Sequence, residues 1–486
     1  MHGHQVRHVR RRTWWPAGRS PRATGAGLTT LIGVAALVAA FAPAAMASSA
    51  GGTASPKYWV ATTSTSTANH SCPTAAYHTV QSAVSAAEIY EGTHPTAVPA
   101  IEVCPGTYTE QVTITKSLVI ARAPKVPASR GPVVIMLPGS PANSFSNCQA
   151  HDATGQHPQS VVEICAASTG GTNTSGVSVS IGHVTIQGAW PSAVCNDNLY
   201  GVLVEGGAAA SIANSVVQKI GGDPTTDGCQ GGVGVDAGNS VTGQVGHAVL
   251  SDDTIESYQK NGVVIDGRGS TSTISDVTVS GAGPTAAIAQ NGIQISLGAT
   301  GSVTGSTVTG NNYTGNGLAY STGILVFGGG GSVCGNGTNS PLVRHASFTG
   351  NSLINNDVGV ALFNVNNGCD KSVHVPTRDV VCNNYISNTH GYAGGVASAD
   401  ANVSGFGKTK YGLVGDQAGV SDSGDRDVIC DNSIHGIGYA PRDKTSTLPN
   451  PRRPAWVRPV DLFSYAPAFH PDADGNTYNG KAYTPN

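Results

Sequence analysis

A short apolar phrase recurs along the middle of the chain. In each copy a glycine precedes two apolar residues that are separated by one position, which is the alternation expected of a β-strand with one buried face. The six copies are Gly201-Val-Leu-Val-Glu205, Gly232-Val-Gly-Val-Asp236, Gly262-Val-Val-Ile-Asp266, Gly292-Ile-Gln-Ile-Ser296, Gly323-Ile-Leu-Val-Phe327 and Gly359-Val-Ala-Leu-Phe363. Their first glycines are spaced by 31, 30, 30, 31 and 36 residues. This nearly constant period predicts a solenoid built from repeated coils.

A second apolar pattern alternates with the first, and in it two apolar residues are five positions apart. The pairs are Ile212/Val217, Leu250/Ile255, Ile274/Val279, Val303/Val308, Phe348/Leu353, Val381/Ile386 and Ile429/Ile434. Residues five apart in one strand face opposite sides, so a bend must separate them if both are buried. Asn351, Asn384 and Asn432 follow the first apolar residue by three positions. Because Asn tolerates the left-handed backbone conformation, these residues are predicted to form the bends.

Together the two patterns predict an all-β fold, a right-handed parallel β-helix. In this solenoid each coil buries its apolar residues against the neighbouring coils. Val263 and Ile265 are therefore expected to point inward. Their expected neighbours in the stack are Val233, Val235, Ile293 and Ile295.

One segment before the repeats has helical periodicity instead. Between Tyr77 and Tyr90 one face of the predicted helix carries Val80, Ala83, Val84 and Ala87. An open solenoid end exposes its core, and terminal caps close it. The segment is therefore predicted to be an N-terminal capping helix.

The N-terminal part of this region resembles the pectin-lyase-like β-helix proteins. The helix contains Thr79-Val-Gln-Ser-Ala-Val84, and an apolar strand then leads into Pro105-Gly-Thr-Tyr-Thr-Glu110, which is similar to the Gly-x-Tyr-x-Glu of pectin methylesterases. The resemblance covers roughly residues 58 to 440 and implies the β-helix fold, with Glu110 in a structural role. The esterase phrases Gln-Asp-Thr-Leu, Asp-Phe-x-Phe-Gly and Leu-Gly-Arg-Pro-Trp are absent. No catalytic residue carries over from that family.

The N-terminal 47 residues have the layout of an export signal. Six arginines precede an apolar run from Leu28 to Ala42, and Ala45-Met-Ala47 offers a small-x-small cleavage site. The apolar run is too short to span a membrane comfortably. A secreted protein without membrane insertion is therefore expected.

The remaining chain divides by composition. Residues 48–57 are expected to be a linker, and residues 58–440 the β-helix. Residues 139–180 and 391–425 have weak periodicity and are expected to be long loops. The Pro-rich tail, residues 441–486, is expected to run back along the β-helix or to cap it, using Trp456, Leu462, Phe463 and Phe469.

Ten cysteines in an exported chain predict disulfides. Sequential pairing gives Cys72–Cys104, Cys148–Cys165, Cys195–Cys229, Cys334–Cys369 and Cys382–Cys430. The last pair has independent support, because Arg378-Asp-Val-Val-Cys-Asn-Asn384 matches Arg426-Asp-Val-Ile-Cys-Asp-Asn432. In adjacent coils these two sulfurs would face each other across about 4.8 Å of strand spacing.

The charge of the mature chain argues against one class of partner. Removing the six N-terminal arginines from 26 Lys and Arg leaves 20, against 29 Asp and Glu, so the net charge is near −9. Such a chain is expected to bind neither nucleic acid nor an anionic membrane.

Acidic residues end the first three copies of the apolar phrase: Glu205, Asp236 and Asp266. In a parallel stack they are expected to form one row at about 4.8 Å spacing, and carboxylates so close cannot all stay ionised without a partner. Lys260, Arg268 or a calcium ion bound by the row would neutralise them, or the pKa values of the acids would be shifted. The alternative is that the acids extend into water at strand ends and Arg268 pairs with Asp266.

Three chemistries fit such a row. The separation between carboxyls in adjacent coils would approach the roughly 5–5.5 Å found in retaining glycosidases. The separation between Glu205 and Asp266 would approach the roughly 6.5–9.5 Å found in inverting ones. If the acids bind Ca²⁺ instead, Lys260 or Arg268 would be the base, as in β-helix polysaccharide lyases. The expected catalytic set is therefore Glu205, Asp236, Asp266, Lys260 and Arg268, acting on a polysaccharide by lyase or hydrolase chemistry.

Two further acidic sets have alternative interpretations. Thr226-Asp-Gly228 with Asp252-Asp253 resembles the acids of polygalacturonases, but that family's Gly-His-Gly and Arg-Ile-Lys are absent, and turn acids at bends explain the set equally. Asp472-x-Asp474-Gly-Asn476 has a spacing that suits calcium and is also common in plain turns.

A non-catalytic protein is the alternative to an enzyme. It would be a β-helix that binds glycan or serves as a surface or structural protein. Only Trp59, Trp190 and Trp456 remain in the mature chain, which favours this alternative because sugar clefts commonly use stacking rings.

Overall fold

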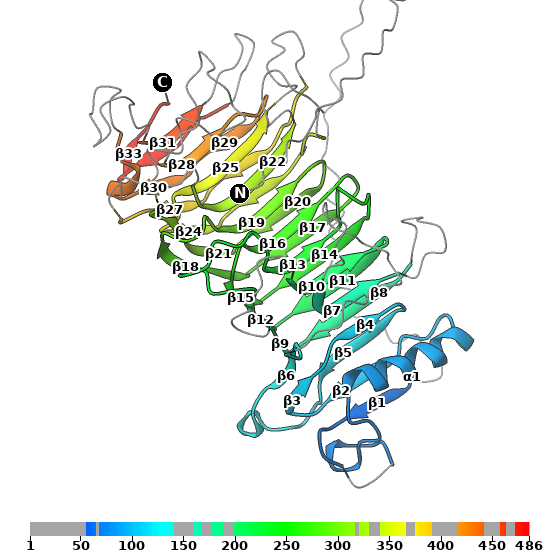
Figure 1. The fold of residues 1–486 in the computed structure, drawn as a ribbon. Coiled ribbons are helices and arrows are strands. Elements are labelled where there is room, and N and C mark those ends of the chain that lie inside the picture. Colours follow the sequence, from blue (N-terminus) through cyan, green and yellow to red (C-terminus); the bar gives the residue numbers. More distant parts are fainter. Residues whose placement is uncertain are drawn as a thin grey trace, which may run out of the picture. The chain divides into compact units, whose positions relative to one another are not determined.

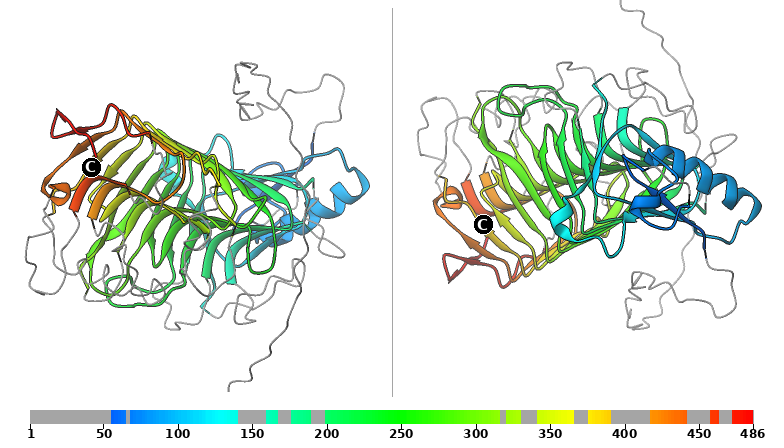
Figure 2. Two further views of the ribbon diagram at one scale, coloured as in Figure 1. Left: turned by 90° about the horizontal axis from the view of Figure 1, so that it is seen from above. Right: turned by 90° about the horizontal axis from the view of Figure 1, so that it is seen from below.

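Three β-sheets contain the alternating apolar segments of the repeats, and each complete coil contributes one strand to each sheet (Figures 1 and 2). The computed structural model describes residues 55–64, 68–139, 159–166, 176–188, 199–315, 320–329, 341–365, 375–390, 417–441, 457–462 and 472–485. The strands of successive coils pair in parallel, from β1 with β2 to β30 with β32. The chain is a right-handed parallel β-helix, as the repeats predict. The expected export signal and most of the linker lie outside the described residues.

Sheet 1 has 11 strands: β1 (Lys57–Val60), β2 (Ala100–Val103), β5 (Leu118–Arg122), β8 (Ser178–Gly182), β11 (Ala208–Ala213), β14 (Gly246–Ser251), β17 (Thr271–Ser275), β20 (Thr300–Thr304), β23 (Ser347–Thr349), β26 (Val380–Cys382) and β29 (Val428–Cys430). Sheet 2 has 10 strands: β4 (Val112–Ile114), β7 (Gln159–Cys165), β10 (Leu199–Glu205), β13 (Val233–Ala237), β16 (Asn261–Asp266), β19 (Asn291–Ser296), β22 (Thr322–Gly329), β25 (Val358–Val365), β28 (Gln417–Asp422) and β31 (Val457–Leu462). Sheet 3 has 12 strands: β3 (Gly106–Thr109), β6 (Val133–Met136), β9 (Thr185–Gln187), β12 (Val216–Ile220), β15 (Thr254–Tyr258), β18 (Thr278–Thr285), β21 (Thr307–Tyr313), β24 (Ser352–Ile354), β27 (Tyr385–Ser387), β30 (Ser433–His435), β32 (Thr477–Tyr478) and β33 (Lys481–Ala482). The helices described are α1 (Val80–Thr93) and the 3₁₀ turns η1 (Cys72–Thr74), η2 (Ala128–Arg130) and η5 (Ile437–Tyr439).

The apolar pairs of the second pattern form two continuous columns in the core. In sheet 1 the column runs through Ile212, Leu250, Ile274, Val303, Phe348, Val381 and Ile429. In sheet 3 it runs through Val217, Ile255, Val279, Val308, Leu353, Ile386 and Ile434. All of these side chains belong to the main core cluster and are at most 1% exposed. The prediction that both members of each pair point inward is confirmed.

The bend between these columns lies one residue earlier than predicted. Positive φ angles occur at Gly350 (68°), Asn383 (60°) and Asp431 (53°). The asparagines that were expected to bend, Asn384 and Asn432 among them, are buried instead. They fill the next position, so their side chains face the neighbouring coils.

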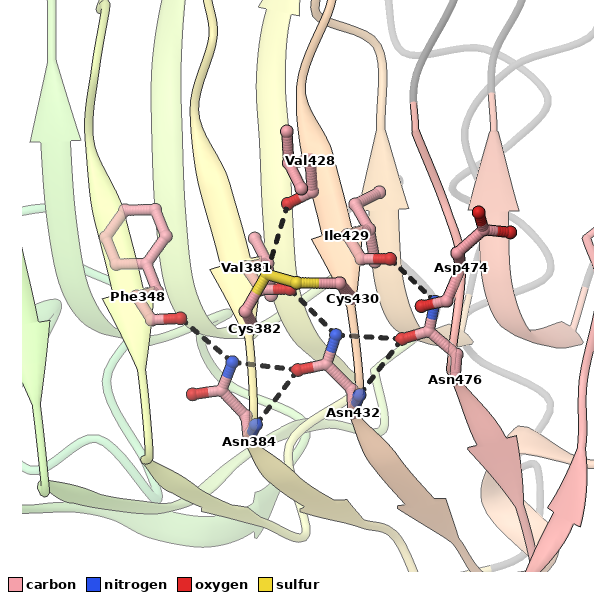
Figure 3. Close-up of a disulfide and its surroundings, with 10 residues drawn as sticks. All are labelled: Phe348, Val381, Cys382, Asn384, Val428, Ile429, Cys430, Asn432, Asp474 and Asn476. Carbon is pink, nitrogen blue, oxygen red and sulfur yellow. Dashed lines mark hydrogen bonds between the residues drawn. A yellow bond between two sulfur atoms is a disulfide. The ribbon is translucent and has the colours of Figure 1, made fainter. Parts of the chain in front are cut away.

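These asparagines form a hydrogen-bonded ladder along the solenoid (Figure 3). Nδ2 of Asn384 donates to Oδ1 of Asn432 at 2.9 Å, and Nδ2 of Asn432 donates to Oδ1 of Asn476 at 2.9 Å. Each amide also donates to a backbone carbonyl, for example from Asn432 to Val381 at 2.8 Å. The ladder satisfies buried polar groups at the bends of the last coils, which is why asparagine occurs there. Asn476 is its last rung here, so the Asp472–Asn476 segment is a coil bend.

Replacing Asn432 by Ala is expected to destabilise the protein by about 1–3 kcal/mol, because it leaves ladder partners in two coils unsatisfied. Chemical denaturation measures the loss. Ser433→Ala, at the next and partly exposed position, is the control and is expected to change stability by less than about 0.5 kcal/mol. Equal effects of the two substitutions would show that the ladder adds no stability.

The N-terminal helix covers the end of the core, as predicted. Val80, Ala83, Val84 and Ala87 of α1 are buried in the main cluster. The two carboxylate oxygens of Glu110 accept the backbone N–H groups of Val80 and Gln81 at 2.7 and 2.8 Å. A carboxylate at a helix N-terminus satisfies free donors and favours the helix dipole. Glu110 is therefore structural, as the family resemblance implies.

Two expected disulfides lie wholly among the described residues. Cys72 bonds to Cys104, with their Cα atoms 5.7 Å apart, and Cys382 bonds to Cys430, with their Cα atoms 4.6 Å apart. Cys382 and Cys430 are direct register partners in β26 and β29, as their matching repeat positions predict (Figure 3). Cys165 and Cys229 are also disulfide-bonded. Their expected partners Cys148 and Cys195, and the Cys334–Cys369 pair, lie outside the described residues.

Some expected boundaries are wrong. Strand β7 and the start of β8 lie inside 139–180, and β28 lies inside 391–425, so these segments are not only loops. The tail also continues the solenoid, because β31 pairs with β28 and β32 pairs with β30. Leu462 packs against the core, whereas Trp456, Phe463 and Phe469 lie outside the described residues. Among the residues described, no helix is both long and apolar enough to cross a membrane.

Candidate active site on sheet 2

The outer face of sheet 2 carries the acidic residues of the repeats. Along β10, Val202 and Val204 belong to the core cluster, and the alternate residues Leu203 and Glu205 do not. Leu203 pairs with Glu163 on one side and with Asp236 on the other. The face therefore has two outward rows. The first row contains Glu163, Leu203, Asp236, Val264, Gln294 and Leu325.

The second outward row lies two residues further along each strand. Glu205 pairs with Cys165, and Asp266 pairs with Ser296. The row continues from Ser296 to Phe327 and then to Phe363. Asp236 is thus not in the row of Glu205 and Asp266, and the expected single row of three carboxyls is wrong.

The expected single row is wrong because the repeat glycine of β13 is Gly234 and not Gly232. Gly234 occupies the position equivalent to Gly201 and Gly262. A Cβ at Gly201 would lie 2.4 Å from the carbonyl oxygen of Gly234, and a Cβ at Gly234 would lie 2.5 Å from that of Gly262. Only glycine allows this approach between coils. Val235 therefore stacks on Val263, and Ala237 stacks on Ile265, whereas Val233 pairs with Asn261.

The four acids form a diagonal arrangement across the coils. Glu163 and Asp236 occupy the first row, and Glu205 and Asp266 the second, in four successive coils. We call this set the carboxyl zigzag. Each diagonal step spans about 7–8 Å between Cα atoms. The carboxyls interact along it, since Glu205 raises the pKa of Glu163, and Asp266 and Glu205 raise the pKa of Asp236.

Burial is the larger cause of these shifts. Glu163 and Glu205 are fully buried, and Asp236 is 8% exposed. Desolvation raises the pKa of Glu163 to about 8 and that of Glu205 to about 7, and it raises the pKa of Asp236 well above its usual value. Asn239 lowers the pKa of Glu205, yet neither carboxyl oxygen of Glu205 has a hydrogen bond of good geometry. The first three zigzag carboxyls thus favour the protonated form.

Asp266 has a different environment from the other three. It is only partly buried. Its Oδ1 accepts the hydroxyl of Ser296 at 2.9 Å, and its Oδ2 accepts the backbone N–H of Ser240 at 2.8 Å. Donors of this kind stabilise a carboxylate. Asp236 and Asp266 are therefore neighbouring acids in contrasting surroundings.

The two basic residues of the expected site do not neutralise the acids. Lys260 precedes β16, at the opposite end of the strand from Asp266, which is about 20 Å away along an extended chain. Its Nζ donates to the carbonyl of Ala289 at 2.6 Å, and burial lowers its pKa to about 8. Arg268 is exposed in the turn after β16, and none of the ion pairs between described residues includes it. The expected Arg268–Asp266 pair is therefore absent.

Metal ligation was a further expectation for Glu205, Asp236 and Asp266. In the described ranges, no group of three or more His, Cys, Asp or Glu side chains is arranged to hold a metal ion. Because Asp236 lies in the other row, the three carboxyls do not converge as a single row would.

An aromatic pair continues the second row beyond the acids. The rings of Phe327 and Phe363 stack with centroids 5.8 Å apart and planes 12° apart. Phe327 is partly exposed. Sequence order already places both residues after Ser296, but only the register shows that they share a row with Asp266 and not with Asp236.

Glu163 is the member of the zigzag that sequence analysis missed. It lies in the segment expected to be a loop, yet Val162 and Ile164 on either side pair with Val202 and Val204. This Val-Glu-Ile alternation was the available signal. The weaker candidate Asp253 is a structural acid, since its carboxylate accepts the N–H groups of Ser215 at 2.8 Å and Ser251 at 3.2 Å.

Replacing Glu163 by Gln is expected to change how stability depends on pH. The folded pKa is about 8 and the ordinary value is 4.5, so between these pH values the folded chain holds one proton more than the unfolded chain. Stability then falls as pH rises through this window, by up to about 1.4 kcal/mol per pH unit. Denaturation from pH 5 to 8 should give a flatter profile for Glu163→Gln. If the slope of stability against pH were the same in both proteins, the pKa of Glu163 would not be raised in the folded chain.

Comparisons with known proteins report structural likeness only. No family model and no curated protein matches the sequence. Among solved structures, the Dettilon tailspike protein aligns with a TM-score of 0.42 and 12% identity, over 80% of this chain and 66% of that one. The A-module of the Azotobacter vinelandii mannuronan C-5 epimerase AlgE6 aligns with a TM-score of 0.39 and 12% identity, over 82% and 95%. Pectin methylesterase PemA from Erwinia chrysanthemi aligns with a TM-score of 0.30 and 11% identity, over 62% and 80%. This chain thus spans just under two thirds of the tailspike.

Proposed function

We propose that this chain is a secreted, carbohydrate-active enzyme that hydrolyses glycosidic bonds of a polysaccharide on the outer face of sheet 2. The observation that supports this most is the contrast between Asp236 and Asp266. One carboxyl is buried and has a raised pKa, and its neighbour is partly exposed and held by two hydrogen-bond donors. Two acids with divergent environments are the requirement for acid and base roles at one pH.

In this mechanism Asp236 is the general acid. Its proton passes to the glycosidic oxygen as the bond from that oxygen to the anomeric carbon breaks. The leaving sugar then departs as a neutral alcohol. Burial holds Asp236 in its protonated form, the Asp266 carboxyl beside it adds to this effect, and Glu205 contributes less.

Asp266 is the carboxylate partner. It attacks the anomeric carbon directly, giving a glycosyl ester that water then hydrolyses with Asp236 as the base, or it takes a proton from a water molecule that attacks in its place. The Ser296 hydroxyl and the Ser240 N–H orient it for either role. Of the two expected lyase bases, Lys260 lies at the other end of its strand, so lyase chemistry on this face would have to use Arg268.

The aromatic pair is the proposed binding platform for a sugar ring. Phe327→Ala is expected to raise KM about 3- to 10-fold with a smaller change in kcat, since stacking contributes equally to the ground state and the transition state. Steady-state kinetics on the identified polysaccharide measure this. Tyr385→Ala is the control, because Tyr385 is 47% exposed but belongs to sheet 3. Equal KM changes in the two variants would remove Phe327 from the site.

A panel of neutral and acidic polysaccharides tests the proposed reaction. Hydrolysis predicts new reducing ends without absorbance from an unsaturated product. Reducing ends together with that absorbance would indicate a lyase. Retention of the protein on a polysaccharide without any product would favour the second candidate, a glycan-binding β-helix, for which the Phe327–Phe363 stack is the supporting observation.

Secretion is part of the same proposal. The Cys72–Cys104 and Cys382–Cys430 disulfides fit an oxidising compartment. Detection of the mature chain in the culture medium, with a new N-terminus close to residue 48, tests it. A chain retained inside the cell with its N-terminus intact would contradict it.

A further inference from the structure

A cleft of about 480 Å³ lies at the N-terminal end of the solenoid, away from the carboxyl zigzag. It is formed by β1, the η1 turn and the loop that follows β5. Residues from these three segments line it, and none of them is acidic. No residue of the proposed hydrolytic site takes part.

The floor of the cleft is apolar and rigid. Trp59, Cys72 and Val126 line it and pack on a small core cluster that includes Ala61 and Cys104. The Cys72–Cys104 disulfide ties η1 to the residue that follows β2, the strand between β1 and β5 in sheet 1. A fixed floor reduces the entropy that binding would cost, so the cleft is preorganised for a ligand.

The rim of the cleft is cationic. Lys57 and Lys125 supply the charge, His70 also lines the rim, and all three residues are exposed. Glu102 orients Lys57, with Nζ 2.7 Å from Oε1, and leaves that lysine side chain 55% exposed. Lys125 has a left-handed backbone, with φ of 62°, in the loop that follows β5.

We propose that this cleft binds a carboxylated sugar unit of an acidic polysaccharide. The ring of Trp59 suits the C–H face of a sugar, and Lys57 and Lys125 suit its carboxylate. The cleft carries two lysines and no acidic lining residue, which complements an anionic ligand. The cleft is an anchoring site, and the proposal does not depend on hydrolysis at sheet 2.

Calorimetric titration with hexagalacturonate, and with maltohexaose as a neutral control, tests the proposal. The Asp236→Asn protein is titrated, so that hydrolysis does not consume the probe. Hexagalacturonate is expected to bind at least about 10-fold more tightly than maltohexaose, and added salt should weaken it. Lys125→Gln in the same background should weaken hexagalacturonate binding about 5- to 10-fold.

The control for Lys125→Gln is Lys481→Gln, which removes an exposed lysine from β33 at the other end of the solenoid. It should leave the affinity unchanged. Equal affinity for both hexamers, or the same effect from both lysine variants, would overturn the cleft assignment. Lys125 lies outside the proposed hydrolytic site. Lys125→Gln in the otherwise native chain should therefore retain kcat on a neutral oligosaccharide. This measurement separates failure of the cleft proposal from failure of the proposed hydrolase.

Discussion

Replacing Asp236 or Asp266 by Asn is expected to lower kcat on the identified polysaccharide by about 100- to 10,000-fold, the usual contribution of a positioned acid or base. Asp236→Asn removes the proton donor, and Asp266→Asn removes the carboxylate that completes the reaction. Both replacements keep the side-chain shape. Asp236→Asn also exchanges a buried, desolvated acid for a neutral amide, so the fold should keep its stability.

The matched control for these variants is Glu256→Gln. Glu256 is a partly buried acid on β15, in sheet 3, and it should be dispensable for turnover. Loss of activity in all three variants would point to a general effect of charge. Full activity of Asp236→Asn would place the reaction elsewhere on the solenoid.

Replacing Ile265 by Ala is expected to destabilise the protein by about 2–5 kcal/mol, the range for deleting a buried aliphatic side chain. Ile265 is fully buried and stacks between Ala237 and Ile295 in sheet 2. Because Ala237 is small, the coil on that side has no side chain that could fill the cavity. Urea denaturation measures the difference in unfolding free energy.

Val264→Ala provides the comparison at the adjacent position. Val264 points to the outer face, and although it is only 6% exposed, it is not part of the main core cluster. Its loss should cost about 1 kcal/mol or less. A larger loss for Val264→Ala than for Ile265→Ala would mean that the strand faces are reversed.

The solenoid could be predicted from the sequence because its repeats are local and periodic. The column from Ile212 to Ile429 follows directly from apolar residues five positions apart. The Cys382–Cys430 bond follows from two matching phrases. Each inference needed only spacing along the chain and the rule that equivalent positions stack in neighbouring coils.

The row of Asp236 could not be predicted in this way. The phrase Gly232-Val-Gly-Val-Asp236 offers two glycines, and both give the same inside–outside alternation because they differ by two positions. The choice depends on the close approach of Gly234 to Gly201 and Gly262, a contact between coils. The role of Asn384 also depends on a contact between coils, because its amide bonds to Asn432 and its own backbone preference does not decide its position.

The site was predicted in part for a related reason. Glu205 and Asp266 lie on the expected face of sheet 2, but Lys260 does not accompany them, because proximity in sequence does not bring opposite ends of one strand together. Glu163 lies between two segments without clear periodicity, so its strand was not recognised. Its partnership with Leu203 is a property of the register alone.

The most direct test of the central claim is a crystal structure of Asp236→Asn with an oligosaccharide of the identified substrate. We expect the chain of sugars to lie on the outer face of sheet 2, with a glycosidic oxygen next to position 236 and a ring on Phe327. The anomeric carbon should face Asp266. Sugar bound along sheet 1 or sheet 3, with the outer face of sheet 2 empty, would contradict the account.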